Sequence, residues 1–394
     1  MQYDIIMLLG FKTKLKLNNK QRTALAKHAG VARHAWNWGL SATKFILDHN
    51  RDNSDSKIKF PSAIDLHKLL VKLVKPENPW YYEVSKCAPQ YALRDLCMAW
   101  ERCFKKISKS PRFKKKGKHD SFTLDGAIKI KGDKQIKVPI IGTLRTFERL
   151  PQVPVKNVTI SRQADYWFIS FKIEVFEKPS EKVDCPVGVD LGLLRFATLS
   201  DSREIDSPRP FKALQEKLAK LQWRNRLKQI GSANWRKAQT KIALLHGHIA
   251  NIRKDFIHKV TTNLAKNHSE IVVEDLNVSG MLANGKLSKA IADSGFYEFR
   301  RQLEYKTKLY GSKLVIADRW FPSSKTCSLC GKKKEFLSLS ERTFSCECGF
   351  ICDRDVNAAI NLVRLVKSDF KPVDKKEPSP LVESGSFFIA VSNC

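Results

Sequence analysis

Four cysteines near the C-terminal end of the chain have the spacing of metal ligands. Cys327 and Cys330 form one close pair, and Cys346 and Cys348 form a second, each pair beside a glycine. Structural zinc prefers four thiolates in a tetrahedron, and two tight turns that each carry two sulfurs supply that geometry. The pattern predicts a zinc ribbon that is closed to water and does no chemistry. Cys352 follows closely and could replace Cys346, and buried reduced cysteines are the alternative to a metal site.

Acidic residues interrupt or end the apolar strands expected in the second half of the chain. Asp190 lies within one such run, Glu274 ends another, and a third acid lies in the string Asp353-Arg354-Asp355. Burying carboxylates beside apolar strands is costly unless a cation compensates. Mg²⁺ or Mn²⁺ takes carboxylate oxygens, and two such ions can act on a phosphodiester. The acids therefore predict a divalent-metal site for phosphodiester chemistry.

The elements around these acids follow the order of a ribonuclease H fold. The strand with Asp190 is followed by a hairpin partner, two long basic helices and the strand that ends at Glu274. A helix at 296–309, a strand at 313–317 and a last helix that begins at the third acid complete the order. In this topology the three acids converge at one sheet edge. Asp275 would point to the opposite face, where it would cap or pair.

The first half of the chain combines strands with inserted helices. Alternating apolar residues predict a strand at 9–17 and several strands within 121–176, which together make a small barrel or curled sheet. Helical spacing begins at Lys20 and resumes over 84–107. With 394 residues, the chain is long enough for two or three separate cores.

The charge of the chain implies a polyanionic partner. Lys and Arg number 71 against 40 acidic residues, a net charge of +31, and nucleic acid is the usual polyanion. In the basic block 105–118 we expect Lys114, Lys115 and Lys116 to contact phosphates rather than only form a solvated face. No apolar run is long enough to span a membrane, so we expect no membrane partner.

The cysteine usage and the N-terminus favour the cytoplasm. Apart from the two close pairs, the ten cysteines are scattered singly, which indicates a reducing compartment. The first residues lack the basic and apolar regions of a signal peptide, and Met7 could equally be the start.

The ordered set of motifs resembles the TnpB family, RNA-guided nucleases that compact bacterial transposons encode and that are related to type V CRISPR effectors. The resemblance extends over nearly the whole chain up to Val366 and is weaker over 11–40. The matching segments are 188–192, 251–259, 273–277, 322–331 and 348–359.

The resemblance implies an α+β multidomain protein. Its first part would be a wedge-type β-barrel with an inserted helical recognition domain. Its second part would be a RuvC-like, ribonuclease H-like α/β nuclease with a zinc-ribbon insertion that binds the target nucleic acid. The implied boundaries are 1–18 and 120–180 for the barrel, 19–119 for the helical domain, 183–319 and 350–366 for the nuclease, 320–349 for the ribbon, and 367–394 for a disordered tail.

The resemblance also assigns roles to residues. By motif match Asp190, Glu274 and Asp355 take the catalytic, magnesium-binding places, and Asp353 is the runner-up for the third. The second cysteine pair is one residue tighter than in many relatives, which leaves one zinc ligand open. Lys86 and Gln90 stand one turn apart in the recognition helices and could reach base edges.

The function implied is RNA-guided DNA cleavage. We expect a guide RNA from the transposon end and two-metal hydrolysis of double-stranded DNA beside a short transposon-adjacent motif. We expect one protein per RNA, in the bacterial cytoplasm at the nucleoid. Two alternatives are a transposase, whose acidic triad can look alike, and a nuclease-silent RNA-guided DNA-binding repressor.

Overall fold

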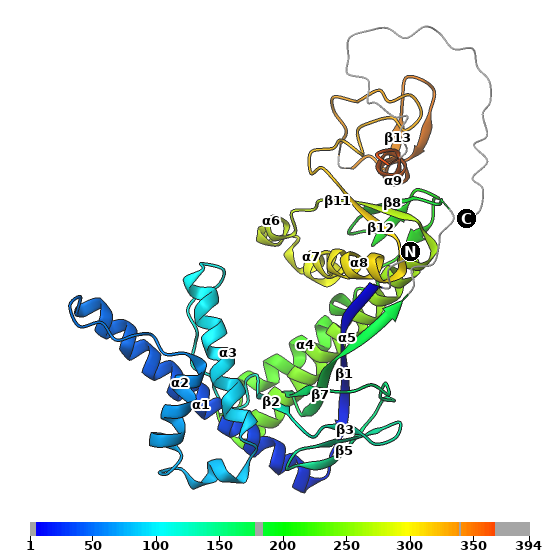
Figure 1. Ribbon diagram of the computed structural model, residues 1–394. Coiled ribbons are helices and arrows are strands. Elements are labelled where there is room, and N and C mark those ends of the chain that lie inside the picture. The colour runs from blue at the N-terminus through cyan, green and yellow to red at the C-terminus, as the bar shows by residue number, and fades with distance from the viewer. Residues whose placement is uncertain (1–4, 178–183, 339, 367–394) are drawn as a thin grey trace. The chain divides into compact units, whose positions relative to one another are not determined.

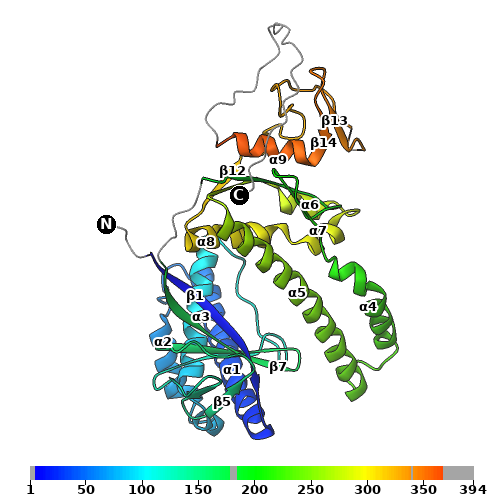
Figure 2. The ribbon, with the colours of Figure 1, turned by 90° about the vertical axis from the view of Figure 1, so that its right-hand side faces the viewer.

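The computed structural model describes residues 5–177, 184–338 and 340–366, so the expected tail at 367–394 lies outside the described residues. The described residues divide into two compact units, one over Ile6–Val175 and one that contains Ile5 and the described residues from Phe176 to Val366. Figures 1 and 2 show the two units as ribbons in two views. Among the helices of the described part, none is long and apolar enough to cross a membrane.

The N-terminal unit contains a seven-stranded sheet with the strand order β2-β6-β7-β1-β5-β4-β3. β1, the first strand of the chain, pairs antiparallel with β5, and Leu15 lies opposite Thr146. The prediction that the N-terminal strand joins the sheet of the later strands is confirmed. The hydrogen-bonded order ends at β2 and β3, and closure into a barrel stays a prediction. The strands are β1 (Ile5–Lys16), β2 (Ser121–Asp125), β3 (Lys129–Ile130), β4 (Gln135–Val138), β5 (Gly142–Thr146), β6 (Asn157–Gln163) and β7 (Tyr166–Glu177).

The helices of this unit begin where the sequence carries capping residues. Asn18 caps the first helix in a capping box with Gln21, because each side chain bonds the backbone N–H of the other. Helices and sheet share one continuous hydrophobic core, which includes residues of α1, α3, β2 and β6. The helices are α1 (Asn19–Asp52), α2 (Ala63–Leu69), the π-helix η1 (Leu70–Val74), the 3-10 helix η2 (Pro79–Glu83) and α3 (Cys87–Phe104).

The second unit is built on a five-stranded sheet with the order β10-β9-β8-β11-β12. β9 pairs antiparallel with β8 and β10, whereas β11 pairs parallel with β8 and β12. The strand, hairpin, helix pair, strand, helix and strand predicted from the sequence are all present in that order. The strands are β8 (Val187–Leu191), β9 (Ala197–Leu199), β10 (Glu204–Ile205), β11 (Glu270–Glu274) and β12 (Lys313–Ala317).

Helices cover both faces of this sheet, with α9 on one face and α5 and α8 on the other (Figures 1 and 2). Val187, Val189 and Val273 pack against the buried phenylalanines of α8, whereas Val272 packs with Leu362 of α9. The helices are α4 (Pro210–Arg226), α5 (Ala233–Asn267), α6 (Val278–Ala283), α7 (Ser288–Ser294), α8 (Phe296–Tyr310) and α9 (Arg354–Arg364).

A small hairpin leads from the cysteine-rich segment into α9. β13 (Thr343–Ser345) pairs antiparallel with β14 (Ile351–Asp353), so that Thr343 lies opposite Asp353. The predicted boundary between the ribbon and the last nuclease segment is at residue 350, but the hairpin continues past this residue. β14 ends at Asp353, and α9 begins at the next residue. The domain boundaries themselves stay predictions.

Candidate active site

Asp190 and Glu274 lie side by side on neighbouring parallel strands. β8 and β11 pair with Val189 opposite Val273, and each acid is the next residue of its strand. The valines of that register are buried, and they hold the strand ends fixed. Because side chains alternate along a strand, Asp190 shares the sheet face of Gly188, which is the face that α9 covers.

Gly188 lets α9 approach this face. A Cβ placed at Gly188 would lie 1.9 Å from the carbonyl oxygen of Ala359, a separation that no side chain tolerates. Ala358 and Ala359 are themselves buried, which keeps the helix surface small at the contact. This packing places the first turn of α9, with Asp355, near the two strand acids.

Asp353 and Asp355 have different tasks at the start of α9. The Asp353 carboxylate caps the helix by accepting hydrogen bonds from the backbone N–H groups of Asp355 (2.8 Å) and Val356 (3.2 Å). It also lies 3.6 Å from the guanidinium of Arg195. In the described part of the chain, Asp355 keeps only a loose ion pair, 3.9 Å from Arg354. The geometry therefore favours Asp355 over Asp353 as the third ligand.

The three acids are coupled electrostatically. Burial, together with the charges of Glu274 and Asp355, raises the pKa of Asp190 to about 8, while Arg354 opposes the shift. The described residues hold no set of three carboxylates with oxygens all within 4.8 Å of one another. The acids thus converge without touching, and a cation among them would relieve the repulsion that disfavours the charged form of Asp190.

Ser323 and two buried asparagines support this site, and the sequence prediction missed their role. The Ser323 hydroxyl donates a hydrogen bond to Glu274. Asn361 of α9 donates to the carbonyls of Ser323 (2.7 Å) and Thr326 (2.6 Å), and Asn357 donates to Thr326 (2.7 Å). Both asparagines are fully buried. The sequence does carry a signal for this role, because two asparagines stand one turn apart on the apolar face of the last helix. Buried amides need hydrogen-bond partners, so such a pair indicates a contact with polar backbone groups.

The four predicted cysteines converge on one point. The Cys327 and Cys348 sulfurs are 3.8 Å apart, those of Cys330 and Cys346 are 3.6 Å apart, and all four lie within 4.8 Å of one another. Tetrahedral zinc with Zn–S bonds of about 2.3 Å requires sulfurs about 3.8 Å apart, so the cluster fits a structural metal ion.

Cys352 lies outside this cluster. Its sulfur donates to the carbonyl of Asp353 on β14, and burial raises the pKa of its thiol to about 11. Cys346 instead begins the knuckle turn, in which its N–H bonds the carbonyl of Phe350. Of the two candidates left open by the spacing, the structure brings Cys346 into the cluster.

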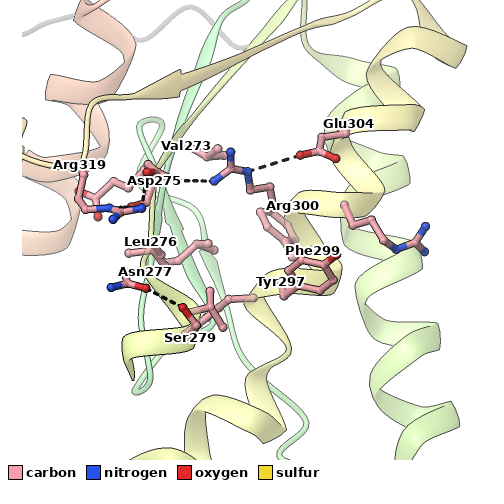
Figure 3. Close-up of a pocket in the computed structure, with 15 residues that line it drawn as sticks. Val273, Asp275, Leu276, Asn277, Ser279, Tyr297, Phe299, Arg300, Glu304 and Arg319 are labelled. Carbon is pink, nitrogen blue, oxygen red and sulfur yellow. Dashed lines mark hydrogen bonds and ion pairs between the residues drawn. The ribbon is translucent and has the colours of Figure 1, made fainter. Parts of the chain in front are cut away.

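Asp275 forms a clamp with two arginines, Arg300 and Arg319 (Figure 3). Its carboxylate accepts hydrogen bonds from Arg300 and, at 2.7 Å, from Arg319. The hydrogen bond from Arg300 makes the largest contribution to a lowered pKa for Asp275. The prediction that Asp275 caps or pairs is confirmed, because its carboxylate forms ion pairs with both arginines.

The candidate nucleic-acid contacts lie on the N-terminal unit. Lys86 and Gln90 are exposed at the start of α3, one turn apart as predicted. Lys114 packs its ammonium 3.8 Å from the ring centroid of Trp36, and burial lowers its pKa while Asp95 opposes the shift. Lys115 and Lys116 are exposed. Contact of these residues with nucleic acid stays a prediction.

Three segments match families of known proteins. Residues 168–285 match a family described as "Probable transposase", and residues 296–362 match one described as "Cas12f1-like, TNB domain". Residues 7–51 match one described as "Helix-turn-helix domain", although the structure has β1 and the single helix α1 over this segment.

Two relatives align over nearly the whole chain. A Streptomyces pristinaespiralis protein, provisionally named an RNA-guided DNA endonuclease, is 39% identical over 90% of this chain and 88% of its own length. An Escherichia coli K12 protein, provisionally named RNA-guided DNA endonuclease InsQ, is 33% identical over 96% of this chain and 99% of its own length. A cryo-EM structure of a Cas12f1–sgRNA–target DNA complex aligns with 91% of this chain and 99% of its own at 13% identity, with a TM-score of 0.48. At these identities and coverages of the two relatives, the chain belongs to the TnpB family.

Proposed function

We propose that this protein is an RNA-guided DNA endonuclease with a RuvC-like, ribonuclease H-like nuclease domain. The observation that carries the proposal is the convergence of Asp190, Glu274 and Asp355, in which burial and two neighbouring carboxylates raise the pKa of Asp190 to about 8. Such a site is poised to bind divalent cations. The names of the two full-length relatives support guidance by RNA and cleavage of DNA.

Asp190, Glu274 and Asp355 would hold two Mg²⁺ or Mn²⁺ ions. Carboxylates that converge without touching leave room for divalent cations among them. Bound ions would supply an activated water and charge stabilisation at the scissile phosphate. Ser323 orients Glu274 through its hydrogen bond, and Gly188 permits the packing of α9 that positions Asp355.

Cys327, Cys330, Cys346 and Cys348 would hold one structural Zn²⁺. The sulfur separations match tetrahedral zinc, and a site with four thiolates leaves no position for water. The ion would stabilise the fold of the ribbon next to α9. The buried asparagines of α9 form hydrogen bonds with the segment 323–328, which leads into the ribbon.

The nucleic-acid partners would be a guide RNA from the transposon end and target double-stranded DNA beside a short transposon-adjacent motif. Base pairing would read the target sequence, and the protein would contribute backbone contacts. The net charge of +31 suits a channel for such a heteroduplex. Lys115 and Lys116 are exposed for phosphate contact, whereas Lys86 and Gln90 could reach base edges.

The test is to purify the protein with its RNA, sequence that RNA, and offer DNA that matches the guide segment. We expect Mg²⁺-dependent cleavage of this DNA. When the guide segment of the RNA is changed, we expect cleavage only of DNA that matches the new segment. Joining of transposon ends by protein without RNA would instead indicate the transposase alternative. Guided binding without any metal-dependent product would indicate the repressor alternative.

A further inference from the structure

The hairpin that α4 and α5 form is strongly basic. Residues 217–254 contain ten lysines and arginines and neither aspartate nor glutamate. Within the described part of the chain, only Arg253 of these bases forms an ion pair, 3.7 Å from Asp293. A surface with such an excess of positive charge attracts a polyanion. The bases are Lys217, Lys220, Arg224, Arg226, Lys228, Arg236, Lys237, Lys241, Arg253 and Lys254.

The two helices have a small hydrophobic core of their own, which leaves three large apolar residues outside. In this core Leu218 of α4 packs with apolar residues of α5, among them Leu245. Trp223, Leu227 and Ile230 lie where α4 ends and the connection to α5 begins, and 57%, 67% and 83% of their surfaces are exposed. Figure 2 shows this end of the hairpin extending away from the five-stranded sheet.

Trp223 lies on the side of α4 that faces away from the core of the hairpin. It stands two residues after Leu221, which packs against that core, and two residues cover slightly more than half a turn of a helix. Lys220 and Leu227 lie one turn before and one turn after Trp223, so the three share an exposed face, and Arg224 is exposed beside them. We name the following residues the hairpin tip: Lys220, Trp223, Arg224, Leu227 and Ile230.

The hairpin tip combines an exposed aromatic ring with exposed cations. Packing does not account for the ring, because it lies outside the core of the hairpin. Single-stranded nucleic acid is bound by this combination, in which the ring stacks on a base and the cations contact the neighbouring phosphates. The tip therefore fits a polyanion that presents an unpaired base.

The need for an unpaired base distinguishes the two nucleic acids of the proposed function. Double-stranded target DNA keeps its bases paired and stacked until it is opened. A folded RNA presents unpaired bases in loops and bulges, and proteins recognise these bases by stacking them on aromatic side chains. The guide RNA is thus the partner that the hairpin tip fits.

We propose that the hairpin tip binds an unpaired loop of the guide RNA, with Trp223 stacked on one base and with Lys220 and Arg224 at the adjoining phosphates. The inference rests on the proposed function and adds an RNA-binding surface to it, separate from the basic block 105–118. Because every base has a face on which a ring can stack, the tip selects an unpaired base rather than one of the four.

The test uses the RNA that copurifies with the protein as the probe. Equilibrium binding is measured over a range of KCl concentrations, and the unpaired bases of the RNA are probed chemically in the complex. Trp223→Ala should raise the dissociation constant by about 5-fold or more, as for one lost aromatic stack, and should expose one RNA loop that the wild type protects. Its salt dependence should equal that of the wild type, because the substitution removes no charge.

Arg224→Gln tests the phosphate contact separately. This variant should also bind the RNA more weakly, and the slope of log K against log salt should become shallower by about 1. An unchanged slope would overturn the phosphate contact of Arg224.

Two control variants separate stacking from folding. Trp223→Phe keeps an aromatic ring and should bind and protect the RNA nearly as the wild type does. Tyr297→Ala removes an aromatic side chain of α8 that is 68% exposed, and it should leave RNA binding unchanged.

Two results would overturn the RNA-binding tip while guided cleavage by the wild type leaves the proposed function standing. One is equal RNA affinity and equal loop protection for the wild type and Trp223→Ala. The other is normal RNA binding by Trp223→Ala with weakened binding of the target DNA, which would assign the tip to DNA. A wild type that binds no RNA would overturn both the tip and the proposed function.

Discussion

Asn357 of α9 accepts a hydrogen bond from the backbone N–H of Ser328, 2.9 Å away. Ser328 follows the first zinc-binding candidate, Cys327, and Asn357 lies two residues after the proposed ligand Asp355. The same asparagine donates to the carbonyl of Thr326. One buried side chain thus connects the cysteine cluster to the helix that carries the third acid.

Asn357→Ala should destabilise the protein and slow cleavage. The substitution leaves the Ser328 N–H without its acceptor in a buried site, which costs about 1–3 kcal/mol, while the Thr326 carbonyl keeps its hydrogen bond from Asn361. Thermal unfolding and single-turnover cleavage measure the two effects. The exposed Asn267→Ala is the control. Unchanged stability and rate would contradict the connection.

Gly188→Ala should disrupt the contact between β8 and α9. The new Cβ would collide with the carbonyl of Ala359, and forced overpacking costs about 1–3 kcal/mol or more. We expect a lower melting temperature and a large loss of cleavage, because α9 can no longer position Asp355. Gly285→Ala, where a Cβ meets nothing within 4 Å, should leave both almost unchanged. A fully active Gly188→Ala protein would refute the role of this close approach.

The stability of the metal-free protein should fall as pH rises toward 8. The folded-state pKa of Asp190 is about 8 and its ordinary value is 3.8, so between these values the folded state binds the extra proton. Raising pH through this window therefore disfavours folding. In chelator, Asp190→Asn should become more stable relative to the wild type as pH goes from about 5 to about 8. Mg²⁺ should raise the melting temperature of the wild type and have little effect on the variant. If the stability of the two proteins changed with pH in the same way, the raised pKa of buried Asp190 would be contradicted.

Metal content should distinguish the two candidate cysteines. Cys346→Ser removes a sulfur from the cluster and should lose bound zinc, whereas Cys352→Ser should retain it. Elemental analysis of the purified variants measures this directly. Full zinc content in Cys346→Ser with loss in Cys352→Ser would reverse the ligand assignment.

Sequence patterns predict the local features of the site better than its tertiary contacts. The strands with Asp190 and Glu274 are predictable because an apolar run that meets an acid is a short-range signal. The choice between Cys346 and Cys352 as a zinc ligand is not predictable from the sequence, because it depends on the turn that β13 and β14 form. The spacing of glycines likewise does not reveal that Gly188 contacts Ala359, which lies far along the chain.

The pocket that Asp275 lines, drawn in Figure 3, and the amide network escape prediction for the same reason. Tyr297 and Asp275 line one pocket only because α8 packs against the sheet, and a polar residue such as Asn361 in an apolar helix face does not identify its partners. In the first half, the strand predicted at 9–17 pairs with a later strand, as expected for a strand that has no other partner nearby. Its sheet order could not be predicted from alternation alone.

The most direct measurement is guided cleavage by Asp190→Ala beside the matched control Asp255→Ala, an exposed acid of α5. Each protein is purified with its RNA, and RNA content and Mg²⁺-dependent cleavage of the matching DNA are measured together. We predict that Asp190→Ala retains the RNA and loses cleavage, while Asp255→Ala retains both. Cleavage by Asp190→Ala at the wild-type rate would contradict the assignment of the active site.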